Sequence, residues 1–218
     1  MKPFSYSVML DLHGKTALVA GGGDVAVRKV RTLCQVGAKV IVIAPKVNST
    51  LTAMAEKGTV SCLLRPVKLE DIDVFAPFVV FAATDDVAVN RALAAYCQRQ
   101  QILVNSITEP EHGNFAVQAT IRKDDFAVSV STYGQGAGFS KALKAYLEAQ
   151  LDERFDRAVA IYIGIRQWLM ETVDDSNERL RLVRGLSLET ICEMMDEGVT
   201  EYDELFERVK EWLSCSLD

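Results

Sequence analysis

The sequence predicts an α/β protein whose first half is a doubly wound parallel sheet, followed by a small α+β region and a helical C-terminal region. Short apolar runs alternate with helix-periodic segments over the first half. A run of three glycines joins the first apolar run to the first such segment. In the last third of the chain, the apolar spacing is helical. We therefore expect three parts, residues 1–112, 113–149 and 150–218.

Composition limits the classes of protein that this chain can represent. It has 218 residues, 49% of them hydrophobic, and a formal net charge of −6. An acidic balance weighs against nucleic-acid or membrane-surface partners, and the apolar runs are too short to span a bilayer. The N-terminus lacks the apolar stretch of a signal peptide, so we expect a cytoplasmic protein. The spacing of the five cysteines and the presence of only two histidines predict neither a disulfide framework nor a metal site.

In the first half, strands are expected to be interleaved with helices. Residues 16–20 and 39–43 are apolar strands around a helix at 25–36, which Gly37 ends. Further helices are expected at about 50–56 and 86–99, and further strands at 60–64, 78–82 and 102–104. Right-handed crossovers through the helices would make these strands parallel.

In the second half, the pattern changes to a strand pair and then to helices. Residues 115–121 and 126–131 alternate apolar and polar side chains around a four-residue connection, which predicts antiparallel strands. A glycine-rich segment, 133–138, leads into a helix from about residue 139. A long amphipathic helix covers 155–166, and another apolar stripe covers 205–213 after a Thr200–Asp203 capping box.

The glycine run contains G-x-G-x-x-A, with Gly21, Gly23 and Ala26 in the motif positions. Gly21 permits a sharp strand-to-helix turn, Gly23 lets a pyrophosphate approach the backbone, and Ala26 lets the helix pack closely. The helix N-terminus offers N–H groups and a positive dipole end to phosphates. Because the motif follows a strand and opens a helix, we predict a Rossmann-type unit that binds NAD. A tight turn without a ligand is the alternative.

Other residues at strand ends complete the expected cofactor site. Gly22, Asp24 and Val25 belong to the same turn. The acidic residue that usually holds the ribose about 20 positions further on is missing, and Pro45 and Lys46 end the second strand instead. Lys46 either reaches a ribose phosphate or is a solvated surface lysine. Thr84 and Asp85 follow the fourth strand and either contact the nicotinamide half or cap the next helix.

Four strings of sequence, in order, carry a resemblance to one family. They are V-A-G-G-G-D-V-A-V-R-K at 19–29, A-A-T-D-D-x-x-V-N at 82–90, V-N-S-I-T-E-P at 104–110 and N-F-A-V-Q-A-T-I-R-K-D-D-F-A-V-S-V-S-T at 114–132. Together they resemble the precorrin-2 dehydrogenase/sirohydrochlorin ferrochelatase family, which includes the N-terminal half of siroheme synthases. The resemblance extends over about residues 7–150.

The resemblance implies an NAD domain, a central dimerisation region at 113–149 and a helical C-terminal region. It implies a homodimer that oxidises precorrin-2 to sirohydrochlorin with NAD as hydride acceptor. One alternative is a bifunctional dehydrogenase and sirohydrochlorin ferrochelatase, because some members also insert ferrous iron. Another is a non-catalytic nucleotide- or tetrapyrrole-binding paralogue. A generic nucleotide-sensing regulator fits the strings less well.

Substrate and catalytic candidates follow from that chemistry. A tetrapyrrole with eight carboxylates needs basic side chains, and Arg122, Lys123 and Lys141 are the candidates. Arg28, Lys29 and Lys144 are further basic residues of the matching segments.

Proton transfer calls for an acid/base group. Many members have N-x-x-D-x-P where this chain has Asn105 to Pro110, with Thr108 in the aspartate position and Glu109 beside it. We expect the catalytic role at Thr108 or Glu109. Threonine is a poor base, and the serine and proline of the family's S-T-x-G-x-S-P are also replaced, which favours dehydrogenation over metal insertion.

Overall fold

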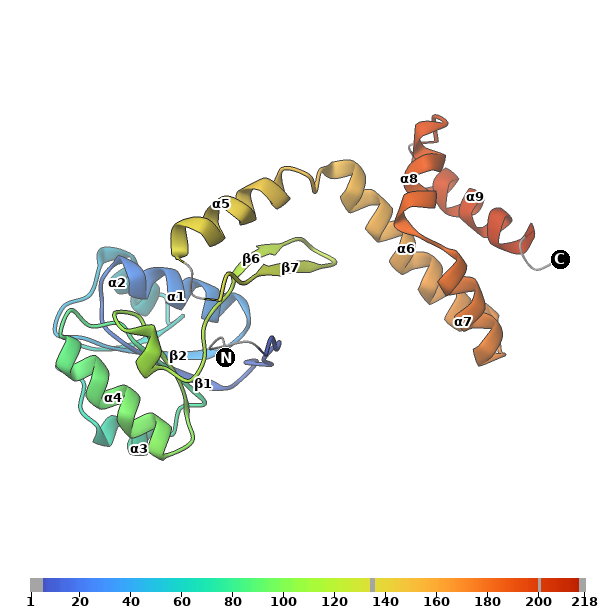
Figure 1. The fold of residues 1–218 in the computed structure, drawn as a ribbon. Coiled ribbons are helices and arrows are strands. Elements are labelled where there is room, and N and C mark those ends of the chain that lie inside the picture. Colours follow the sequence, from blue (N-terminus) through green and yellow to red (C-terminus); the bar gives the residue numbers. More distant parts are fainter. Residues whose placement is uncertain (1–5, 134–135, 200, 216–218) are drawn as a thin grey trace. The chain divides into compact units, whose positions relative to one another are not determined.

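The computed structural model describes residues 6–133, 136–199 and 201–215, with Ala137 and Cys215 described by their backbones only (Figure 1). The chain divides into two compact units, Met1–Val117 and Gln118–Asp218. Within the described residues, no helix is both long enough and apolar enough to cross a membrane.

The first unit is built on a five-stranded parallel sheet with the strand order β3-β2-β1-β4-β5. Its strands are β1 (Thr16–Ala20), β2 (Lys39–Ile43), β3 (Ser61–Leu63), β4 (Val79–Ala82) and β5 (Leu103–Ser106). In the register, Leu18 of β1 lies between Ile41 of β2 and Val80 of β4. The strand order reverses between β1 and β4, and in such sheets a crevice for ligands opens at the carboxyl ends of those two strands.

Helices cover both faces of this sheet. Alternate residues of β1 separate two cores. Ala17 and Val19 pack with α1 (Asp24–Gln35) and α2 (Ser49–Glu56). Leu18 and Ala20 pack with α3 (Glu70–Phe75) and α4 (Val87–Arg99). The doubly wound parallel sheet predicted from the sequence is confirmed.

Local signals fix the ends of these helices. Gly37 has φ +74° and follows the end of α1. Asn48 caps α2 by accepting from the Thr50 N–H at 2.8 Å, and Asp86 caps α4 by accepting from Ala88 and Val89. The cap of α4 is therefore Asp86 and neither Thr84 nor Asp85.

The second unit consists of a hairpin followed by helices. The hairpin pairs β6 (Ala119–Arg122) with β7 (Ala127–Val130) in antiparallel register. The helices are α5 (Ala137–Glu148), α6 (Glu153–Thr172), α7 (Ser176–Gly185), α8 (Leu188–Asp196) and α9 (Tyr202–Cys215). Their shared core includes Ile165 of α6, Ile191 of α8 and Leu205 of α9, each 0% exposed.

Several boundaries differ from expectation, two of them next to the junction of the parts. The strand expected from residue 115 begins at Ala119, because Phe115 belongs to the first unit. Its ring lies edge-on to Phe81 at 5.6 Å between centroids, and its carbonyl accepts from Asn105 Nδ2 at 3.1 Å. The helix expected from about residue 139 begins at Ala137. Thr200 of the expected capping box and residues 134–135 of the glycine-rich segment lie outside the described residues.

Candidate functional site

The first two glycines of the turn are required by neighbouring loops. Gly21 directly follows β1 with φ +126°, and a Cβ there would lie 2.1 Å from the carbonyl oxygen of Ala83. A Cβ on Gly22 would lie 2.1 Å from the carbonyl oxygen of Lys46. The loops after β2 and β4 therefore close tightly on this turn.

Gly23 has a different environment. Its φ of −82° is open to any residue, and a Cβ there would meet nothing within 4 Å. It is the N-cap of α1 and has no side chain, so the N–H groups of the first turn have no side-chain cap. A phosphate group fits this arrangement, because N–H donors and the helix dipole converge where no side chain intervenes.

The loop after β2 is fastened to the glycine turn through Asn48. Its backbone N–H donates to the Gly22 carbonyl at 2.8 Å, and its Nδ2 donates to Asp24 Oδ1 at 2.8 Å. Pro45 and Lys46 in this loop are exposed. They lie on the adenosine side of the expected crevice, beyond the carboxyl end of β2.

The loops after β4 and β5 are joined by Asn90 of α4, whose side chain is fully buried. Its Oδ1 accepts from the Thr84 N–H and hydroxyl at 3.1 and 2.8 Å. Its Nδ2 donates to the Thr84 carbonyl at 2.9 Å and to Thr108 Oγ1 at 3.3 Å. One amide thus holds Thr84 and Thr108 at adjacent strand ends, while Asp85 is exposed.

Glu109 is held by Arg91 of α4. Arg91 Nε donates to Glu109 Oε2 at 2.7 Å, and Arg91 Nη2 donates to Oε1. These hydrogen bonds from the guanidinium hold the pKa of the Glu109 carboxyl below its usual value. Glu109 is therefore an ionised carboxylate at neutral pH.

Glu109 also lies in a group of potential metal ligands with Glu111 and His112, whose ligand atoms are all within 4.8 Å of one another. Because both oxygens of Glu109 already accept from a cation, we assign no metal centre to this group.

The basic residues of the two units have different environments. Lys29 of α1 places its Nζ over the Phe81 ring at 5.6 Å, and burial, followed by the charge of Arg28, lowers its pKa. Arg122 and Lys141 of the second unit are exposed. Lys123 is engaged within that unit, because its Nζ donates to the Leu151 carbonyl at 3.0 Å and to Asp156 at 2.7 Å.

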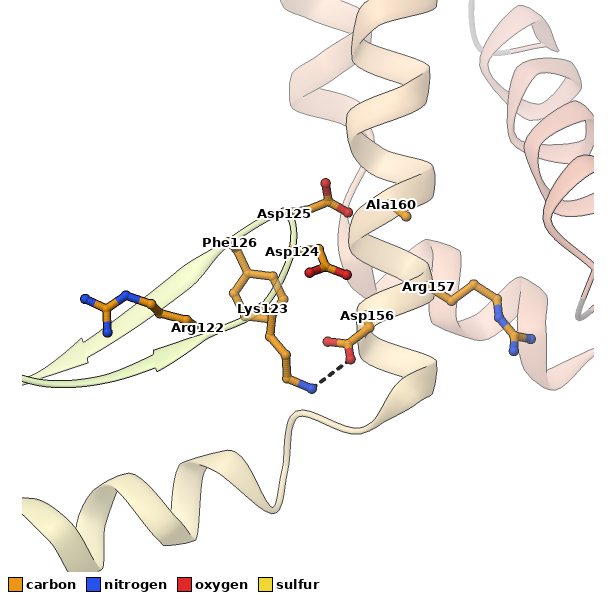
Figure 2. Close-up of a pocket in the computed structure, with 8 residues that line it drawn as sticks. All are labelled: Arg122, Lys123, Asp124, Asp125, Phe126, Asp156, Arg157 and Ala160. Atoms are coloured by element: carbon orange, nitrogen blue, oxygen red, sulfur yellow. Dashed lines mark hydrogen bonds and ion pairs between the residues drawn. The ribbon is translucent and has the colours of Figure 1, made fainter. Parts of the chain in front are cut away.

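Figure 2 shows Lys123 reaching Asp156 across a pocket of about 430 Å³, while Arg122 extends away from α6. This pocket lies between the hairpin turn and α6, entirely within the second unit. The acidic residues Asp124, Asp125 and Asp156 line the pocket together with the basic residues Arg122 and Lys123, so the pocket carries charges of both signs.

The structure thus collects the expected cofactor residues at the start of α1 and on the loops at the carboxyl ends of β1, β2 and β4. Sequence reasoning missed the roles of Asn48, Asn90 and Arg91. Asn90 was visible only as the last letter of the A-A-T-D-D-x-x-V-N string, and an asparagine among the apolar residues of a helix is a signal that could have identified it.

Comparisons with known proteins identify a family for this chain. Residues 8–119 match the family model described as "Putative NAD(P)-binding". The precorrin-2 dehydrogenase of Priestia megaterium is 28% identical over 192 residues, which cover 88% of this chain and 90% of that protein. The solved structure of SirC, a precorrin-2 dehydrogenase, superposes with a TM-score of 0.76 at 25% identity, over 94% of this chain and 99% of that one.

Siroheme synthases are also similar, and they are longer proteins. The siroheme synthase of Thioalkalivibrio sulfidiphilus (strain HL-EbGR7) is 30% identical over 213 residues, 98% of this chain and 43% of that protein. The chain therefore spans less than half the length of this relative. The resemblance stated from the sequence is confirmed, and the chain belongs to the NAD(P)-binding family that comprises precorrin-2 dehydrogenases and the corresponding part of siroheme synthases.

Proposed function

We propose that the protein is an NAD-dependent precorrin-2 dehydrogenase that forms sirohydrochlorin in siroheme biosynthesis. The observation that carries this proposal is the open N-terminus of α1 at Gly23, in a chain that aligns with 90% of a precorrin-2 dehydrogenase. Bound NAD would supply the hydride acceptor, so the protein would mainly bind, orient and exclude water.

Each part of the crevice has a proposed role. The turn from Gly21 to Val25 would hold the pyrophosphate, with Pro45 and Lys46 beside the adenosine. Thr84 and Asp85 would border the nicotinamide. Asn90 would hold Thr84 and Thr108 at a fixed spacing through its bonds to both.

Oxidation removes a hydride and a proton from the substrate, and the proton needs an acceptor. Thr108 and Glu109 are the proposed groups at that end of the crevice. Because Arg91 lowers the pKa of Glu109, this carboxylate is a weak proton acceptor at neutral pH. Its pairing favours a role in orienting the loop after β5, with Thr108 facing the ligand.

The proposed substrate contacts are Arg122, Lys123 and Lys141, because a polycarboxylate needs cationic partners. Arg122 and Lys141 are exposed and ready for such contacts. Lys123 would have to exchange its bonds to Leu151 and Asp156.

We also propose a homodimer formed through the region around β6, β7 and α5. Within the described residues, β6 and β7 pair only with each other, and isolated two-stranded hairpins are marginally stable. No described side chain of α5 is buried, and Phe139 and Tyr146 are 54% and 66% exposed. A second copy of this chain would cover these surfaces.

The cytoplasm is the proposed compartment, where thiols such as those of Cys34, Cys62, Cys97 and Cys192 stay reduced.

An anaerobic assay with enzymatically generated precorrin-2 tests the function. We expect the absorbance of sirohydrochlorin to appear with NAD and to increase more slowly with NADP. Nucleotide binding without turnover would instead favour the non-catalytic paralogue, which the threonine at position 108 motivates. Ferrous ion added to enzyme and sirohydrochlorin tests the bifunctional alternative, since siroheme forms only if the protein accelerates metal insertion.

A further inference from the structure

The end of β2 lacks the carboxylate that usually binds the adenosine ribose in this fold. Exposed Pro45 and Lys46 stand there instead. A basic residue at this position would attract the 2′-phosphate of NADP. The ribose of NAD, in turn, has no carboxylate acceptor at the end of β2.

A carboxylate from another element contacts the loop that follows β2. Asp24 is the first residue of α1, and its side chain is exposed. Its Oδ1 accepts from Nδ2 of Asn48, at 2.8 Å, in the loop that follows β2. The carboxylate of Asp24 therefore lies against the β2 loop, although the residue belongs to the glycine turn.

Asn48 is fixed at three points, so the position of its amide is well defined. Its Oδ1 accepts from the Thr50 N–H, its backbone N–H donates to Gly22, and its Nδ2 points to Asp24. Within the described residues, Oδ2 of Asp24 has no hydrogen-bond partner. One carboxylate oxygen is thus anchored and the other is available as an acceptor.

We propose that Asp24, oriented by Asn48, replaces the missing ribose-binding carboxylate and makes the site prefer NAD to NADP. Asp24 accepts from the ribose hydroxyls of NAD, and its charge opposes the 2′-phosphate of NADP. Asn48 is a positioning residue that acts through Asp24. This inference rests on the proposed nucleotide-binding function and adds its specificity.

Binding calorimetry with NAD and NADP tests the inference without any turnover. Asp24→Asn keeps an oxygen for the Asn48 bond and removes the charge. We expect its preference for NAD over NADP to fall by about tenfold or more, because the variant loses both the charged acceptor for the ribose hydroxyls and the repulsion of the 2′-phosphate. Glu56→Gln is the matched control, since it removes an exposed carboxylate at the last residue of α2 and should leave both affinities unchanged.

Asn48→Ser separates positioning from folding. A serine still caps α2, so the melting temperature should change little, but its side chain is too short to hold Asp24. We expect weaker NAD binding in Asn48→Ser and no further loss when this change is added to Asp24→Asn. A role of Asn48 in stability alone would instead lower the melting temperature and leave NAD binding unchanged.

The outcomes distinguish this inference from the proposed function. A wild-type protein that binds neither nucleotide would overturn both. NAD binding with an unchanged preference in Asp24→Asn would overturn only the assignment of Asp24, as would a wild-type preference for NADP.

Discussion

The Cβ position of Gly23 faces open space, whereas those of Gly21 and Gly22 lie 2.1 Å from carbonyl oxygens of neighbouring loops. The sequence motif alone predicted the sharp turn and the close approach of a ligand. It did not predict that Gly22 is required as well, because the contact with Lys46 depends on how the β2 loop folds back. The pattern thus predicted the turn, while tertiary contacts determine which of the three glycines the fold requires.

Gly23→Ala should separate ligand binding from stability. The free energy of unfolding should change by less than about 1 kcal/mol, because the added methyl meets nothing, whereas NAD affinity should fall at least about tenfold. Gly23→Asp should abolish NAD binding by adding a negative charge at the phosphate position. Calorimetry and thermal unfolding measure the two effects. Gly22→Ala is the comparison, and it should destabilise the fold because the Lys46 carbonyl must move.

The Glu109–Arg91 pair predicts the sign of a pH effect. The guanidinium lowers the pKa of Glu109, so the pair is complete above the ordinary glutamate range and is lost as pH falls through the lowered pKa. If turnover needs ionised Glu109, the acid limb of the kcat profile lies below the ordinary glutamate pKa. Arg91→Met should move that limb to higher pH, and Glu109→Gln should remove it. Arg99→Met, on the same helix, should leave the limb in place; an unmoved limb in Arg91→Met would remove Glu109 from the mechanism.

At the scale of elements, strongly periodic segments were predictable and short polar ones were not. The ranges 16–20 and 39–43 match β1 and β2, because continuous apolar runs between turn signals leave few alternatives. The sequence analysis missed α3, and it gave no separate ranges for α7 and α8 within the region that it predicted to be helical. For α3 the reason is physical: only six residues long, it is too short to show a helical period, and it is held by the Arg65–Asp71 ion pair together with buried Ile72. The strand expected from residue 115 was wrong at its start because Phe115 packs on Phe81 instead.

The attachment of the hairpin to α6 gives a prediction at this scale. Lys123 bonds to Leu151 and Asp156, and the Phe126 ring lies edge-on to Phe155 at 5.7 Å between centroids. Lys123→Met should destabilise the second unit by about 1 kcal/mol and speed proteolysis of the hairpin turn. Arg122→Met should leave unfolding unchanged and raise KM for precorrin-2. Equal unfolding of the two variants would mean that Lys123 does not hold the hairpin.

At the scale of the whole molecule, the proposed dimer predicts a change of oligomeric state. Phe139→Asp and Tyr146→Asp each place a charge on the exposed face of α5 and should convert the dimer to a monomer in light scattering. Leu180→Asp is the control, because Leu180 is 47% exposed on α7, outside the proposed interface. Dissociation in all three variants, or in none, would contradict an interface through α5.

The three glycines also differ in how they would tolerate evolutionary drift. Gly21 and Gly22 are held by the fold itself, so any descendant that keeps this sheet must keep them. Only an occupant of the crevice constrains Gly23, since no neighbouring atom of the chain does. A lineage that abandoned its nucleotide would therefore accumulate side chains at the third glycine first, with the other two intact. The glycine retained at position 23 is what continued selection for a ligand would leave behind.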